Sequence, residues 1–254
     1  MNVEAVRQAL RHFTRTHHAA FSVVAARESQ LLELGAIVAV ELHYRSNGYS
    51  SLIRSPEGTG TFVVKISTRG HPAKYSSILF EKSGETTEAH MNLLVRGAHD
   101  EGIYCVDVGI VHAGVVPEKV DRKVKWVCAP NDSLLSLVEA KRLNVYPMLL
   151  AQFVGIVHEI KPRFLSAPTP TGFSPDLQLP PTLIALGHFS GNSKAIVDAF
   201  RGRSITICIA ENFDMRLAAH RKGTTRSPLY WDDPGHTDDA RSSVRLEAAV
   251  PATE

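Results

Sequence analysis

Cysteine is scarce in this chain, with Cys105, Cys128 and Cys208 as the three examples among 254 residues. None of them forms a CxxC pair, and an odd number cannot be fully paired within one chain. This pattern argues against a disulfide framework and against a cysteine-based zinc cluster. We therefore expect reduced thiols and a cytoplasmic location.

Long apolar runs are also missing. No stretch approaches the roughly 18 apolar residues that a membrane-spanning helix needs. The first residues, MNVEAVRQALRHFTRTHH, lack the apolar centre that is typical of a signal peptide. We expect no membrane partner for this chain.

A strong net charge is absent too, because 28 Lys and Arg residues nearly balance 26 Asp and Glu residues, which gives +2. A site for nucleic acid would therefore be a local patch rather than the whole surface. The 44% hydrophobic composition is enough for a substantial core. We expect one domain over residues 1–223, including an N-terminal helical and β extension. Residues 224–254, rich in small and charged side chains, are expected to be a disordered tail.

Apolar periodicity predicts alternating helices and strands. Helices are expected over residues 3–16, 28–44, 146–160 and 193–200. Strands are expected over residues 51–53, 61–67, 76–80, 89–95, 103–111, 134–141, 182–186 and 204–210. Long apolar strands that alternate with helices indicate an α/β fold, a central mixed sheet flanked by helices on both faces.

Three ionisable residues interrupt otherwise apolar strands. Asp107 lies within IYCVDVGIV, and Glu139 and Lys141 end the run LLSLVEAK. Residues i and i+2 of a strand point to the same side, so Glu139 and Lys141 project together. If the two strands are neighbours, Asp107 joins them at one end of the sheet. Two adjacent buried carboxylates repel each other unless a cation neutralises them, and both a divalent metal and the Lys141 ammonium suit that role.

This arrangement resembles the PD-(D/E)xK nuclease superfamily, whose members have a restriction-endonuclease-like core. The motif reads CVDVGIV followed by LSLVEAK and then a helix. The resemblance implies that Asp107 and Glu139 bind Mg²⁺ or Mn²⁺, and that Lys141 orients water or stabilises the transition state. It further implies a metal-dependent endonuclease that hydrolyses DNA, with RNA not excluded as a substrate.

Other residues extend the resemblance or depart from it. Many members carry a Gln on the following helix, where this chain has Gln152; some add an acid from the first core helix, here Glu33 or Glu41. Val106 replaces the proline of the motif, and the long separation from Asp107 to Glu139 requires an inserted loop. Asp132 is a rival to Asp107, although it follows Pro130 in what reads as a turn.

Each residue also has a purely structural interpretation. Asp107 would then pair with Arg96 or cap a turn, and Glu139 with Lys141 would be the solvated end of a strand. Gln152, Glu33 and Glu41 would be ordinary surface residues of helices. The basic residues in 119–125 and Arg216, Arg221 and Lys222 would be solvated, whereas in a nuclease they would contact phosphates.

The resemblance also implies a biological setting. Members of this size commonly serve restriction, anti-phage defence or repair, and many are homodimers or other homo-oligomers. Two other functions stay open: a catalytically inactive nucleic-acid-binding domain of the same fold, and an effector switched by an activating ligand or partner protein. The first predicts carboxylates too far apart to share a metal, and the second predicts a nucleotide signal bound by the N-terminal half.

Overall fold

The computed structural model describes residues 3–22, 28–56, 58, 60–120, 127–166, 178–201, 203, 205–213, 215 and 230–232. The helices are α1 (Val3–His17), α2 (Glu28–Ser46), α3 (Pro147–Ile160), α4 (Arg163–Ser166) and α5 (Gly191–Arg201), with a 3-10 turn at Pro72–Lys74. The strands are β1 (Ala20–Phe21), β2 (Ser50–Arg54), β3 (Thr61–Phe62), β4 (Ser77–Lys82), β5 (Glu85–Arg96), β6 (Ile103–His112), β7 (Leu134–Lys141), β8 (Thr182–Ala185), β9 (Cys208–Ala210) and β10 (Tyr230–Asp232).

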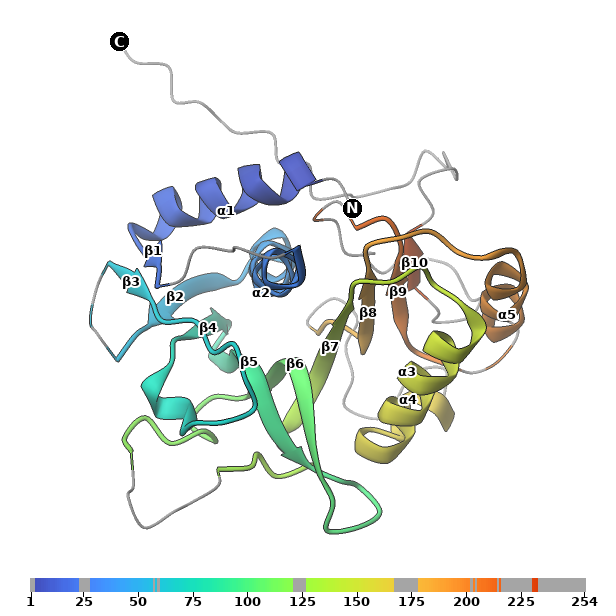
Figure 1. The fold of residues 1–254 in the computed structure, drawn as a ribbon. Helices are drawn as coiled ribbons and strands as arrows, with labels where there is room; N and C mark the ends of the chain where they lie inside the picture. The colour runs from blue at the N-terminus through green and yellow to red at the C-terminus, as the bar shows by residue number, and fades with distance from the viewer. Residues whose placement is uncertain are drawn as a thin grey trace.

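The central sheet is mixed, in the strand order β10-β9-β8-β7-β6-β5-β4-β2 (Figure 1). The strands from β2 to β7 pair antiparallel, and β7 to β10 pair parallel. The change of direction falls after β7, where α3 carries the chain back to start β8 beside it. A parallel neighbour requires such a crossover, and helices are its usual form.

Helices cover both faces of this sheet, as expected (Figure 1). On one face α2 contacts β5, β6 and β7, with α1 packed outside it, in a core that includes Ile37, Ile78 and Val108. On the other face α3, α4 and α5 enclose a second core around Phe153, Phe164 and Leu137. The nearly all-round apolar sequence of α2 is explained by its place between α1 and the sheet.

Most expected elements are present with small shifts of their ends, but two expected strands are much shorter. The strand expected over residues 61–67 ends at Phe62, because the N–H groups of Val63 and Val64 donate to the hydroxyls of Ser76 and Ser22 instead of to a ladder. The strand expected over 204–210 begins only at Cys208. Before it, the N–H of Thr206 donates to the carbonyl of Phe164.

Some expectations concern parts of the chain that are only partly described. Within the segment expected to be a tail, Tyr230–Asp232 forms β10 beside β9, and the rest of 224–254 lies outside the described residues. The basic positions 121–125, 216, 221 and 222 lie outside them as well. All three cysteines are free, and Cys208 is buried. Among the described helices, none is both long and apolar enough to cross a membrane.

Candidate active site

The sheet opens between β6 and β7. Their ladder pairs Gly109 with Leu137 and ends at the pair Val108 and Val138. Beyond this pair, β6 continues along β5 and β7 continues along β8. The two strands that were expected to carry the site are therefore neighbours, and they part just where the site residues begin.

Asp107 bridges this opening. Its Oδ2 atom accepts a hydrogen bond from the backbone N–H of Ala140 at 2.7 Å and another from Nζ of Lys141 at 3.2 Å. Because the ladder has ended, the N–H of Ala140 has no backbone acceptor on β6, and the Asp107 carboxylate accepts its hydrogen bond instead. Buried backbone donors need such a partner. The expected convergence of β6 and β7 residues is present at this end of the sheet.

Glu139 is the most deeply buried member of the group, with a relative exposure of 3%. Its Oε2 lies 2.6 Å from Nζ of Lys141, whereas its Oε1 is buried without a hydrogen-bond partner. Burial and the negative charge of Asp107 raise the pKa of Glu139 to about 7, although Lys141 and the backbone N–H of Asp107 oppose the rise. A buried carboxylate with one oxygen unsatisfied is an unfavourable arrangement that an additional cation would relieve.

Lys141 lies between the two carboxylates. Burial acts to lower its pKa, but the charges of Glu139 and Asp107 and their hydrogen bonds outweigh it, so the pKa is raised above the ordinary value. The ammonium is therefore charged at neutral pH. Nζ of Lys141 lies 3.2 Å from Oδ2 of Asp107 and 2.6 Å from Oε2 of Glu139, so the two carboxylates lie around one ammonium.

The two acids of α2 have different surroundings. Glu33 is close enough to the site that Asp107 and Lys141 affect its pKa, which burial and the charge of Asp107 raise, while Asn92 and Lys141 act to lower it. Glu41 lies elsewhere, fully buried, with its Oε1 at 3.0 Å from Nε2 of His17 and 2.8 Å from the hydroxyl of Ser51. Of these two candidates, the structure places Glu33 with the site.

Sequence reasoning missed two residues beside the site, Lys65 and Asn92. The Lys65 ammonium donates to the carbonyl of Asn92, and the Asn92 amide donates to the carbonyl of Lys65 at 2.8 Å. Asn92 has a φ of 47°, a left-handed conformation inside β5 that asparagine tolerates better than most residues. Lys65 is 4% exposed, and burial lowers its pKa. A lysine inside the apolar run FVVKIS was the available signal.

Gln152 and Asp132 are not brought into this group. Gln152 is exposed on α3, and within the described residues no hydrogen bond joins it to Asp107, Glu139 or Lys141. Its role stays a prediction. Asp132 is exposed in the turn before β7, at the opposite end of that strand from Glu139. Asp107 is therefore the acid that can act with Glu139.

The structural interpretations of the three central residues can be compared with these contacts. Arg96 pairs with Glu101, not with Asp107. Glu139 is buried rather than solvated, so the end of β7 is not a solvated strand end. The pairing of Asp107 with Arg96 and a solvated Glu139 are therefore not observed, whereas the bond from the Ala140 N–H to Asp107 is a structural contact.

The oxygen donors of the site suit magnesium or manganese better than zinc or copper. In the described part of the chain, no three His, Cys, Asp or Glu side chains are grouped so that they could hold a metal ion. Magnesium, however, is commonly bound through one or two carboxylates, with water and substrate phosphate completing its shell. Asp107 and Glu139, with the unpartnered Oε1 of Glu139, fit that requirement.

Comparisons of the chain with protein-family models, with curated proteins and with solved structures find no match. The functional argument therefore depends on the geometry of the site.

Proposed function

We propose that this protein is a Mg²⁺-dependent endonuclease that hydrolyses phosphodiester bonds of DNA, with a core like that of the PD-(D/E)xK nucleases. The observation that carries the proposal is that Asp107 and Glu139 flank a single ammonium, Lys141, where β6 and β7 part. The order of a strand with Asp, a strand with Glu-x-Lys and a helix is retained as β6, β7 and α3.

Each residue has a distinct role in this proposal. Asp107 and Glu139 would hold Mg²⁺ or Mn²⁺, and such an ion supplies charge neutralisation at the scissile phosphate and a bound water of lowered pKa. Lys141 has three N–H donors, and in this structure its ammonium contacts both carboxylates. Once a metal ion takes that place, the displaced ammonium would donate to a phosphate oxygen as negative charge grows there. Glu33 tunes the charge of the site from α2.

The contact of both carboxylates with the one ammonium of Lys141 favours this function over an inactive domain of the same fold. An inactive domain predicts carboxylates too far apart to share a metal, whereas here both contact one Nζ atom. A setting in restriction, anti-phage defence or repair, and assembly as a homodimer or other homo-oligomer, are parts of the proposal that follow from the resemblance alone.

The test is cleavage of supercoiled plasmid DNA by the full chain, with Mg²⁺, with Mn²⁺ and with EDTA. Glu139→Gln and Lys141→Met are the site variants, and Glu101→Gln and Lys74→Met, both at exposed positions, are their controls. We expect cleavage by the wild type and both controls only with metal, and a loss of about 10²-fold or more in the site variants. Cleavage that survives both site substitutions would rule out this site. Cutting of a single-stranded RNA in place of plasmid would change the substrate class but retain the site.

A further inference from the structure

A row of polar side chains crosses three strands at the β2 edge of the sheet. Arg54 on β2 pairs directly with Ser77 on β4, and Ser77 pairs directly with His90 on β5. Residues that are directly opposite each other lie on the same face. Their sequence neighbours Ile53, Ile78 and Ala89 point the other way, into the core shared with α2. The polar row therefore lies on the face turned away from α2.

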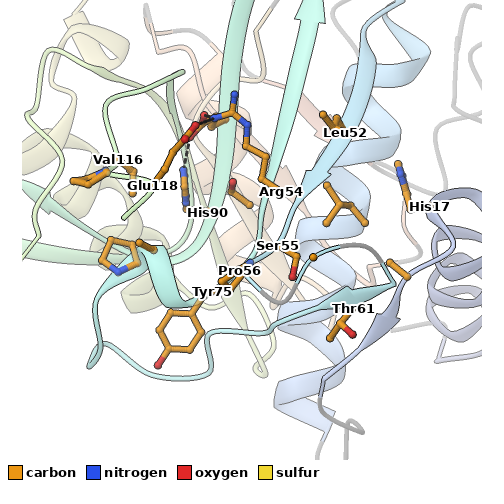
Figure 2. A pocket seen from close by; sticks show the side chains of 18 of the residues that line it. His17, Leu52, Arg54, Ser55, Pro56, Thr61, Tyr75, His90, Val116 and Glu118 are labelled. Carbon is orange, nitrogen blue, oxygen red and sulfur yellow. Dashed lines mark hydrogen bonds and ion pairs between the residues drawn. The ribbon is translucent and has the colours of Figure 1, made fainter. Parts of the chain in front are cut away.

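A cavity of about 550 Å³ lies over this row (Figure 2). Arg54, Glu118 and His90 gather toward one end of it, and His17 lies toward the other (Figure 2). Its walls come from separate segments of the chain and combine polar side chains with apolar ones, which include Leu52, Pro56, Pro72, Val116 and Pro117. Cavities of this size, with apolar walls and a few polar groups, are typical binding sites for small molecules.

The charged groups of the cavity already balance one another. Glu88, 2% exposed, accepts from Arg54, from Nε2 of His90 at 3.0 Å and from the backbone N–H of Gly114 at 3.4 Å. Burial acts to raise the pKa of Glu88, but the bond and charge of His90, with Arg54 and Gly114, lower it overall. Glu88 is therefore ionised and satisfied at neutral pH.

The Arg and His side chains of the cavity are also engaged. Arg54 is shared between Glu88 and Glu118, and the ring of His17 bonds to Glu41. Among the lining residues that are described, each Arg or His thus pairs with a carboxylate. A phosphate group would have to break one of these pairs, so the cavity favours an uncharged ligand over a nucleotide.

Several polar groups of the lining make no ion pair, among them the hydroxyls of Thr61, Tyr75 and Ser77. The hydroxyl of Ser77 and Nδ1 of His90 have no hydrogen-bond partner among the described residues, and they lie on directly paired positions. Nε2 of His90 faces Glu88, so Nδ1 is the ring nitrogen left for a ligand. The hydroxyl of Ser77 can donate or accept. Together they match a ligand edge with two adjacent hydrogen-bonding atoms.

We propose that this cavity binds an uncharged heterocycle of nucleoside size, held at its polar edge by Ser77 and His90. Its flat faces pack against the apolar walls. The proposal does not depend on the nuclease function. The cavity lies in the N-terminal half, where a nucleotide signal was one of the expected ligands. Its paired charges favour an uncharged compound in place of that nucleotide.

The test is titration of the full chain with adenosine, guanosine, cytidine and uridine, and with their 5′-monophosphates, by calorimetry and saturation-transfer NMR. We expect at least one nucleoside to bind with a Kd below about 1 mM, and its monophosphate to bind about tenfold more weakly. Ser77→Ala and His90→Gln should each weaken the nucleoside about tenfold. The controls Ser50→Ala and His112→Gln, both at exposed positions, should not.

Three results would overturn the proposal: binding by none of the four nucleosides, monophosphates that bind more tightly than nucleosides, or equal affinity in wild type and Ser77→Ala. Ser77→Ala removes one hydroxyl and keeps the rest of the side chain, and its fold is checked by circular dichroism. The result therefore stands even if His90→Gln fails to fold.

Discussion

The carboxylate of Asp107 on β6 accepts a hydrogen bond from the backbone N–H of Ala140 on β7 at 2.7 Å, just beyond the last pair of the β6–β7 ladder. This bond fixes Asp107 at the point where the two strands separate. Because Glu139 and Lys141 flank Ala140 in sequence, the same bond places Asp107 beside both of them.

Asp107→Asn should abolish cleavage while Asp132→Asn leaves it unchanged. The amide of asparagine can still accept from Ala140, but it has no negative charge for a metal ion or for Lys141. We expect a loss of about 10²-fold or more in the plasmid cleavage rate for Asp107→Asn. The reverse outcome, with Asp132→Asn inactive and Asp107→Asn active, would move the metal site to the other end of β7.

The stability of the metal-free protein should fall as pH rises through about 7. Glu139 holds its proton in the folded state up to a pKa of about 7 but releases it near 4.5 when unfolded. Between these values the folded state binds more protons, so the free energy of unfolding decreases with pH. Chemical denaturation in EDTA from pH 4.5 to 8 should show about 1 to 3 kcal/mol of this loss. Glu139→Gln should remove it.

The exposed acid Glu101 supplies the control for this pH dependence, since Glu101→Gln should leave the slope as in wild type. Added Mg²⁺ should stabilise the protein more at pH 8 than at pH 5, because metal ligands must be deprotonated. A slope that Glu139→Gln does not alter would show that another group carries the titration.

Lys141→Met should separate metal binding from cleavage. The ammonium now lies between the two carboxylates, in the space that a shared metal would use. Its removal should therefore retain or increase Mn²⁺ affinity, measured by calorimetry, while cleavage falls about 10²-fold or more. Lys74→Met should change neither quantity. Loss of Mn²⁺ binding in Lys141→Met would argue that the lysine organises the carboxylates instead of serving the reaction.

The two acids of α2 should give opposite results. Glu33→Gln removes a carboxyl group whose pKa depends on the charges of Asp107 and Lys141. Cleavage should therefore fall about tenfold, with little change in the free energy of unfolding. Glu41→Gln weakens bonds to His17, Ser51 and Arg45 inside the fold. It should lower the free energy of unfolding by about 1 to 3 kcal/mol and leave the cleavage rate of folded protein unchanged.

The sequence was a good guide where one strong pattern decides the structure. Continuous apolar strands such as Leu134–Lys141 predicted the central mixed sheet, and the acids that interrupt them predicted the convergence of Asp107 and Glu139. It was a poor guide where hydrogen bonds between distant segments decide. The apolar alternation of FVVKIS predicted a strand, yet Val63 and Val64 bond to serine side chains instead.

Position along a helix also left choices open that packing resolves. Glu33 and Glu41 are about two turns apart on α2, roughly 12 Å along its axis, and both were candidates for the site. The packing of α2 places Glu33 near Asp107 and Glu41 near His17. The cavity was not predicted, because the row of Arg54, Ser77 and His90 depends on the register of three strands. Turn geometry and strand pairing set that register, and neither can be predicted from the sequence of each strand alone.

The most direct test of the shared metal is an anomalous difference map from a crystal soaked with Mn²⁺. We predict a peak bound by one oxygen of Asp107 and by Oε1 of Glu139, each at roughly 2.1 Å, with Nζ of Lys141 moved aside. Full Mn²⁺ occupancy elsewhere, with the two carboxylates still bonded only to Lys141, would contradict the account.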